Sequence, residues 1–188
     1  MDEKASLPAR LAWAALEDWA YGKQETSRVE QLVKSTGSSG SAEEQAALDA
    51  LTSQRAGVFV SYKKLGELRG CIGTIQATTA SIFTEICTYA VVAASEDPRF
   101  NPIRPQELPN ITCSVDVLGA AEPVQDVSAL DAERYGVIVS SGYRRGLLLP
   151  NLEGVDTPGQ QIDIALRKAG IRPDEPYSLE RFEVVRYK

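Results

Sequence analysis

The chain has 188 residues, of which 43% are hydrophobic, and a formal net charge of −6. This composition is typical of a globular protein with one substantial core. The acidic balance disfavours nucleic acid as a partner, because negative charge repels phosphate groups unless basic residues cluster. No apolar run approaches the roughly 20 residues of a membrane helix, and the charged first residues lack a signal core. We therefore expect a cytoplasmic protein without a membrane segment.

The first predicted elements in chain order are two helices separated by a polar segment. Helical periodicity over residues 6–21 predicts an amphipathic helix. Residues 23–40 are polar and end in the small-residue run STGSSGS, which indicates a flexible insertion within the domain. Ser41 and Glu44 have the spacing of a capping box, which predicts a second helix ending near residue 54.

The middle of the chain has the pattern of a β-hairpin followed by a helix. Residues 57–64 alternate, and a turn at 64–66 leads into a second strand over 67–77. Apolar residues then recur at helical spacing after Thr78 or Thr79, either of which could cap this helix. Pro98 ends it and opens a proline-rich connection over 97–105.

The remaining elements alternate between strands and one helix. We expect a strand over 110–119, a hairpin over 135–150, a helix over 157–170 and a final strand over 178–187. Because helices and strands mix without regular βαβ alternation, the pattern predicts an α+β fold. Its mixed or antiparallel sheet would be flanked by helices.

The chain has three cysteines and no histidine. An odd number of cysteines without a C-x-x-C pair suits a reducing compartment and disfavours both a disulfide framework and a zinc site. Cys87 and Cys113 follow apolar patterns and are predicted core residues. Without histidine, catalysis would need a thiol, carboxylate, lysine, tyrosine, a bound cofactor or a metal. The sequence specifies no cofactor.

Cys71 has a different setting, within the strand segment GELRGCIGTI. Strict alternation places Arg69, Cys71 and Gly73 on one face, with Arg69 about 7 Å from Cys71, where its charge would favour the thiolate. Gly73 would leave open space beside the sulfur, and Gly70 and Gly73 would let a ligand reach backbone N–H groups. Alternatively, Cys71 is a core residue and Gly73 marks a β-bulge. The residues alone leave both interpretations open.

Two further segments carry candidate ligand-binding residues. The strand over 110–119 presents Ser114 and Asp116 on its polar face, which is either a solvated outer face or the lining of a cleft opposite Cys71. In a cleft, Asp116 could accept a proton or hold a ligand. In the proline-rich connection, Asp97 and Arg99 could pair with each other, or Arg99 could bind an anion through its planar guanidinium.

Four segments in order resemble the AMMECR domain family over nearly the whole chain. They are LRGCIG (68–73), DPRFNPI (97–103), ITCSVDVL (111–118) and GLLLP (146–150). The resemblance implies one domain over 1–188, with a larger lobe, a smaller lobe and the hexapeptide near a cleft between them. Members are often encoded with, or fused to, a Memo-type dioxygenase-like protein and a radical S-adenosylmethionine protein, which are therefore the implied partners.

The resemblance supplies context and site residues, because the activity of the family is unsettled. The positions that match its motifs are Arg69, Gly70, Cys71, Gly73, Asp97 and Arg99. Tyr135 stands where the family commonly has histidine.

Two hypotheses follow for the function. In the favoured one, the chain is an accessory module that binds a small ligand or peptide, because Cys71 has no histidine with which to form a Cys–His pair. In the other, Cys71 is the nucleophile or sulfur ligand of a thiol-dependent enzyme and Arg69 activates it.

Overall fold

The computed structural model describes residues 5–22 and 26–188, which divide into two units. The larger unit runs up to Val117 and takes in Arg186–Lys188, and the smaller unit is Leu118–Val185. Over the described residues the fold is α+β, with two four-stranded sheets whose strands pair antiparallel. The predicted fold class is confirmed, and the two units correspond to the predicted lobes. The cleft between the lobes stays a prediction.

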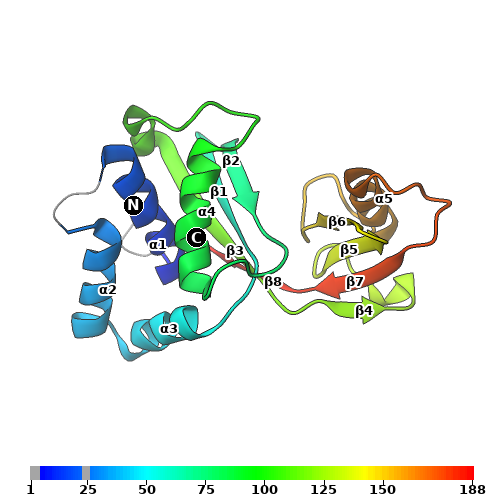
Figure 1. Ribbon diagram of the computed structural model, residues 1–188, viewed down its shortest axis with the longest axis horizontal. Coiled ribbons are helices and arrows are strands. Elements are labelled where there is room, and N and C mark those ends of the chain that lie inside the picture. The colour runs from blue at the N-terminus through cyan, green and yellow to red at the C-terminus, as the bar shows by residue number, and fades with distance from the viewer. Residues whose placement is uncertain (1–4, 23–25) are drawn as a thin grey trace. The chain divides into compact units, whose positions relative to one another are not determined.

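The first sheet has the strand order β2-β1-β3-β8 and is covered by helices on one face (Figure 1). Helix α4 packs on β1 and β2, and α1 packs on α4. The elements are α1 (Leu7–Tyr21), α2 (Arg28–Ser39), α3 (Ala42–Ser53), β1 (Val58–Lys64), β2 (Glu67–Gly73), α4 (Ile82–Ser95), the 3₁₀ helix η1 (Pro105–Asn110), β3 (Ile111–Leu118) and β8 (Val184–Tyr187).

Alternation along β1 decides which face of this sheet is apolar. Val58, Val60 and Tyr62 are fully buried against the helices, and the Tyr62 hydroxyl donates a 3.0 Å hydrogen bond to the carbonyl of Ala90 in α4. Because side chains alternate, the residues between them point to the opposite face. Ser61 is among these, so the face away from the helices carries polar side chains.

The prediction of a flexible insertion over 23–40 is wrong for the part that forms α2, while residues 23–25 lie outside the described residues. Ser27 and Glu30 form a capping box that starts this helix. The carboxylate of Asp18 in α1 accepts hydrogen bonds from the backbone N–H groups of Arg28 and Val29. The small-residue run that suggested a linker therefore forms the last turns of α2. The first turn of this helix is bound to α1 through Asp18.

Helix α4 begins at Ile82, later than predicted. Its N-cap is Ser81, whose hydroxyl accepts a hydrogen bond from the N–H of Thr84, so neither Thr78 nor Thr79 is the cap. Those two threonines bind the carboxylate of Glu85 instead. A capping pattern in the sequence did not distinguish three nearby hydroxyl residues.

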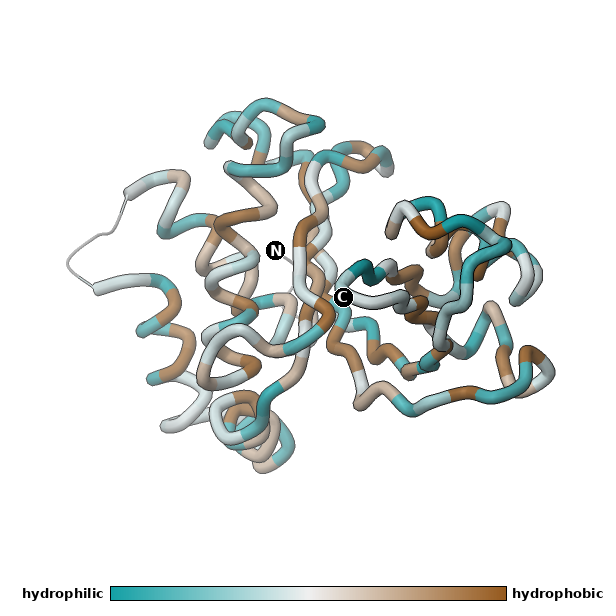
Figure 2. Tube along the Cα trace, turned by 45° about the vertical axis from the view of Figure 1, so that its right-hand side comes forward, coloured by the Kyte–Doolittle hydropathy of each residue, from teal (hydrophilic) through white to brown (hydrophobic). Residues whose placement is uncertain are grey.

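The smaller unit holds the second sheet, with strand order β4-β7-β5-β6 and helix α5 packed on β5 and β6. Its elements are β4 (Glu122–Val124), the 3₁₀ helix η2 (Val127–Ala129), β5 (Gly136–Ser141), β6 (Arg144–Leu148), α5 (Pro158–Ala169) and β7 (Ser178–Phe182). Figure 2 shows apolar residues recurring along the strands of each unit. Each unit has its own buried apolar cluster.

The single last strand predicted over 178–187 is two strands in different sheets. β7 pairs with β4 and β5, whereas β8 follows β3 in the first sheet, and Glu183 lies between them. The carbonyl of Glu183 accepts a 2.8 Å hydrogen bond from the N–H of Gly119, where β3 has just ended. Alternation alone continued across this break, so the sequence pattern did not show it.

None of the helices in the described ranges has the length and apolarity needed to cross a membrane.

Candidate functional site

Cys71 lies on β2, the edge strand of the first sheet, in a polar row that crosses three strands. It is paired with Ser61 on β1, and Ser61 is paired with Ser114 on β3. The hydroxyl of Ser61 donates a 3.1 Å hydrogen bond to the sulfur of Cys71. All three side chains are partly exposed on the face away from the helices. We call Cys71, Ser61 and Ser114 the thiol row.

The backbone of Cys71 is held at the sheet edge by two side chains of the 97–103 segment. The carboxylate of Asp97 accepts a 2.9 Å hydrogen bond from the N–H of Cys71, and Arg99 Nη2 donates a 3.1 Å hydrogen bond to its carbonyl. Asp97 in turn binds Arg99 through Nε and Nη2, at 2.9 and 2.7 Å. Edge strands expose such backbone groups, and this clamp satisfies them without a further strand. The structure thus brings together Cys71, Asp97 and Arg99 of the predicted site.

Asp97 and Arg99, the two side chains of this clamp, both stay charged. Hydrogen bonds from Arg99 hold the pKa of Asp97 well below its usual range, although burial acts in the other direction, and the N–H groups of Cys71 and Arg99 add to the lowering. Asp97 is 4% exposed, whereas the side chain of Arg99 is 54% exposed. The pKa of Arg99 is raised, first by its hydrogen bonds to Asp97 and also by the negative charge of Asp97, although burial acts in the other direction. Arg99 is therefore a fixed and accessible cation beside the thiol.

A second fixed cation comes from the last strand. Arg186 on β8 binds Asp116 on β3 through Nε and Nη2, at 2.7 and 2.9 Å. Asp116 is 2% exposed and the Arg186 side chain 39% exposed. The pKa of Arg186 is raised, first by the hydrogen bonds to Asp116 and also by the negative charge of Asp116, although burial acts in the other direction. Asp116 lies two residues after Ser114 on β3, so Arg186 meets this sheet on the face that carries the thiol row.

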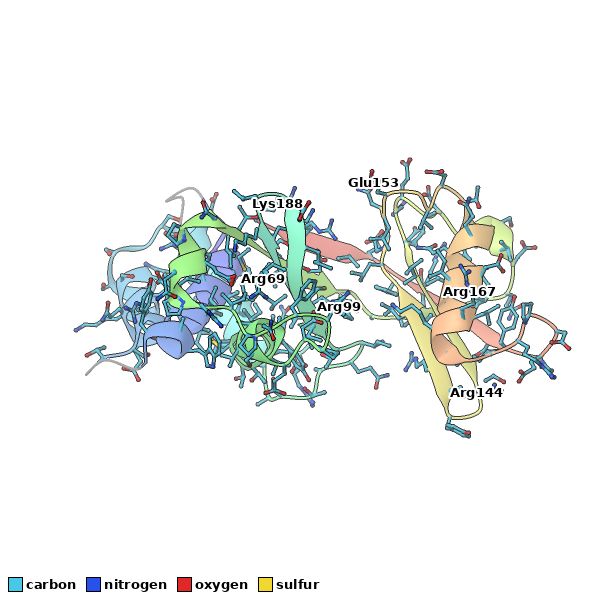
Figure 3. All side chains as sticks on the ribbon, turned by 90° about the horizontal axis from the view of Figure 1, so that it is seen from above. Arg69, Arg99, Arg144, Glu153, Arg167 and Lys188 are labelled. Carbon is cyan, nitrogen blue, oxygen red and sulfur yellow. The ribbon has the colours of Figure 1, made fainter. Side chains whose placement is uncertain are left out.

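Arg69 is bound to a carboxylate, and its predicted role in activating Cys71 stays a prediction. Arg69 Nε and Nη2 bind the carboxylate of Glu107 in η1, with a shortest distance of 2.8 Å, and Lys64 binds the same carboxylate. The β1–β2 register shifts between Tyr62 and Lys63, so strict alternation fails beside Arg69. Figure 3 shows Arg69 and Arg99 on the larger unit. Within the described residues, the arginine side chain that bonds to Cys71 is Arg99.

Gly70 and Gly73 are needed for close packing of the backbone. A Cβ at Gly70 would lie 2.3 Å from the carbonyl oxygen of Ala93 in α4, and one at Gly73 would lie 2.0 Å from that of Val58 in β1. The predicted open space beside Gly73 is therefore wrong, because β1 and the ring of Phe59 fill it. A ligand-binding role for either glycine stays a prediction.

We expect Gly70→Ala to lower the free energy of unfolding by about 2 kcal/mol or more, because a new Cβ would force β2 away from α4. Gly159 in the first turn of α5 is the matched control, since a Cβ there meets nothing within 4 Å. Gly159→Ala should be neutral or stabilising. Urea unfolding of both variants measures the effect. Equal stability of Gly70→Ala and the wild type would contradict the packing role.

The other two cysteines lie on the apolar side of the larger unit, as predicted. Cys87 and Cys113 pack against its core cluster. Burial raises the pKa of each thiol to about 12, with the charge of Asp18 adding to the effect at Cys87. These two thiols are structural, and Cys71 is the cysteine on the polar face.

Sequence reasoning missed Ser61, Glu107 and Arg186. Ser61 lies on β1 between the buried residues Val60 and Tyr62, so alternation could have placed it opposite the core. Arg186 lies 70 residues from Asp116 in the sequence, and no local pattern joins the two. Within the described ranges, no group of three or more cysteine, aspartate or glutamate residues is placed to hold a metal ion.

Tyr135, which stands where the resembling family has histidine, lies in the smaller unit. Its ring contacts two guanidinium groups, of Arg134 at 4.8 Å and Arg181 at 4.4 Å. Arg134 also binds Glu183, and Arg181 binds Glu122. The contacts of this one ring with two guanidinium groups give Tyr135 a structural role next to β5.

The fold and site define an α+β protein of two units in which a clamped edge strand presents a thiol on a polar sheet face. The AMMECR1 family model matches residues 10–188, so the chain belongs to the AMMECR1 family. The predicted family is thereby confirmed.

Known relatives agree with this assignment. A Thermotoga maritima protein is 51% identical over 142 residues, which cover 74% of this chain and 82% of the relative. A Clostridium acetobutylicum protein is 51% identical over 134 residues, but the match covers only 28% of that longer protein and 71% of this chain. The crystal structure of the uncharacterized protein PH0010 from Pyrococcus horikoshii has a TM-score of 0.78 at 25% identity. That match covers 99% of this chain and 91% of the other.

Proposed function

We propose that this chain is an accessory, ligand-binding component whose site is the thiol row together with Arg99 and Arg186. The observation that carries the proposal is a partly exposed cysteine that accepts a hydrogen bond from Ser61, with Arg99 fixed at its backbone and Arg186 fixed on Asp116 of the same sheet face. Binding sites place a few oriented polar groups on a rigid scaffold in this way. The scaffold here is a sheet whose edge is clamped at Cys71.

Binding is favoured over catalysis because the two carboxylates near the thiol already accept hydrogen bonds. Asp97 binds Arg99 and the N–H of Cys71, and Asp116 binds Arg186. A general base must be able to accept a proton from the reacting group. The sequence also contains no histidine that could serve instead.

The partners we propose are a Memo-type dioxygenase-like protein and a radical S-adenosylmethionine protein, as the family resemblance implies. The chain would bind a small ligand or a peptide for reactions carried out by those proteins. The AMMECR1 match of the chain supports this context, and the polar face around Cys71 supports the binding role.

Size-exclusion chromatography of the purified chain with both partner proteins tests the proposal. We expect co-elution with at least one partner, and slower alkylation of Cys71 in the complex, measured by mass spectrometry. Arg172→Lys is the control variant, because Arg172 is 74% exposed in the smaller unit. Separate elution from both partners together with an unchanged alkylation rate would overturn the proposal.

A thiol-dependent enzyme is the second candidate function, favoured by the hydrogen bond from Ser61 to the Cys71 sulfur and by Arg99, which binds the carbonyl of Cys71. Such donors stabilise a thiolate nucleophile. In this case Cys71→Ser would abolish turnover by the reconstituted system, and a covalent adduct would form on Cys71. Turnover that persists in Cys71→Ser would exclude this second function and leave the binding role.

A further inference from the structure

The free hydrogen-bond donors of the site belong to one end of each guanidinium group. Arg99 uses Nε and Nη2 for Asp97 and the carbonyl of Cys71, and Arg186 uses Nε and Nη2 for Asp116. Within residues 5–22 and 26–188, no acceptor meets Nη1 of either arginine. Each arginine therefore has a terminal donor group left for a ligand, on a side chain whose position its carboxylate already fixes.

The charge balance of these two pairs selects the kind of ligand. Arg99 with Asp97 and Arg186 with Asp116 each sum to zero, so the site as a whole has no excess positive charge. Hydrogen bonds from guanidinium N–H groups still favour an anionic acceptor. A dianion would add two uncompensated charges near two carboxylates, whereas a monoanion adds one. The pairs thus favour a carboxylate over a doubly charged phosphate.

The length of the thiol row sets a further requirement. Neighbouring strands lie about 4.8 Å apart, so the row from Cys71 through Ser61 to Ser114 spans roughly 10 Å. The row is longer than a carboxylate group. A ligand bound through its carboxylate would therefore also contact the row with the atoms next to that carboxylate. The two serine hydroxyls can donate or accept hydrogen bonds along that length.

We propose that the thiol row, with Arg99 and Arg186, binds the carboxylate of a small organic acid or of a peptide C-terminus. This inference rests on the proposed function and names the ligand class for its site. The ligand's carboxylate receives hydrogen bonds from Nη1 of one of the two arginines, Arg99 at the Cys71 end of the row or Arg186 near Ser114, and its adjoining atoms lie over the thiol and the hydroxyls.

Protection of Cys71 against a neutral alkylating reagent tests this ligand class. Iodoacetamide modification of Cys71 in the full chain is followed by mass spectrometry, with sodium propionate or sodium phosphate at equal ionic strength. We expect propionate at four times its dissociation constant to slow alkylation about fivefold, by mass action. Phosphate should have a smaller effect at the same concentration. An acetylated tetraglycine with a free or an amidated C-terminus separates the two sources of carboxylate, since only the free form should protect.

Arg186→Lys tests the role of the terminal guanidinium donor, because lysine keeps the charge beside Asp116 but lacks Nη1. Protection by propionate should fall to less than half in the variant of the arginine that binds it, while Arg172→Lys should retain it. Thermal melting of both variants shows whether they are folded, and Arg99→Lys repeats the test at the other cation. Undiminished protection in both Arg99→Lys and Arg186→Lys would overturn the assignment of the donors.

The outcomes separate this inference from the proposed function. Stronger protection by phosphate than by carboxylates, or protection by neither, would overturn the ligand class while leaving the binding role. A Cys71 that iodoacetamide does not modify in the native protein would overturn both, because the thiol row would then be closed to any ligand.

Discussion

Glu85→Gln is expected to lower the free energy of unfolding by about 4 kcal/mol, the larger of two predicted effects. Glu85 in α4 is fully buried, and its carboxylate accepts hydrogen bonds from the backbone and hydroxyl groups of Thr78 and Thr79 and from the hydroxyl of Thr74. The amide nitrogen of glutamine cannot accept from these donors, so some would be left buried without a partner. The segment between β2 and α4 would lose hydrogen bonds that attach it to α4.

The loss of stability caused by Glu85→Gln should depend on pH. Burial raises the pKa of Glu85, but the hydrogen bonds from Thr74, Thr79 and Thr78 outweigh it, and the net pKa is lowered. A lowered pKa means that the carboxylate stabilises the fold above about pH 5 and loses this effect as the pH falls through its folded-state pKa. The difference between the variant and the wild type should therefore shrink in acid.

Guanidinium chloride unfolding at pH 7 and at pH 3 measures this difference. The exposed Glu153 in the smaller unit, labelled in Figure 3, provides the control Glu153→Gln, which should change stability by less than about 0.5 kcal/mol. A Glu85→Gln protein as stable as this control at pH 7 would show that the carboxylate does not hold the segment.

Asp97→Asn is expected to cost about 3 kcal/mol at pH 7, because charge-assisted hydrogen bonds to Arg99 and to the N–H of Cys71 are lost or weakened. The cost stays below that of Glu85→Gln, since Arg99 is 54% exposed and water can replace its partner. Without the clamp, the edge of β2 opens at Cys71. Alkylation of Cys71 should accordingly become faster in the variant.

Urea unfolding at pH 7 and pH 3 checks the energetic part, and mass spectrometry checks the thiol. The pKa of Asp97 is held well below its usual range, chiefly by hydrogen bonds from Arg99, so its contribution is present above about pH 5 and declines as the solution becomes more acidic. Asp174→Asn is the control, because Asp174 is 77% exposed. An Asp97→Asn protein with unchanged stability and unchanged Cys71 alkylation would refute the clamp.

Periodicity was sufficient to predict most helices and strands, because their apolar faces are the buried ones. It failed where contacts between residues far apart in the sequence determine the local structure. The polar α2 is fixed by Asp18 of α1, which no pattern within residues 23–40 could reveal. The last strand changes sheets at Glu183 although its alternation continues.

The site could be predicted only in part for a similar reason. The family motifs pointed to Cys71, Asp97 and Arg99, which the structure brings into direct contact. The register shift beside Arg69 broke the alternation on which its predicted role depended. Arg186 belongs to the end of the chain, and only the pairing of β8 with β3 brings it to Asp116.

The central claim is that Cys71 lies on the polar face of its sheet, whereas Cys87 and Cys113 pack against the apolar core cluster. The rates at which iodoacetamide modifies the three cysteines of the native protein test this most directly. We expect Cys71 to react at least tenfold faster than Cys87 or Cys113, whose pKa values burial raises to about 12. A Cys71 that reacts as slowly as those two would contradict the claim.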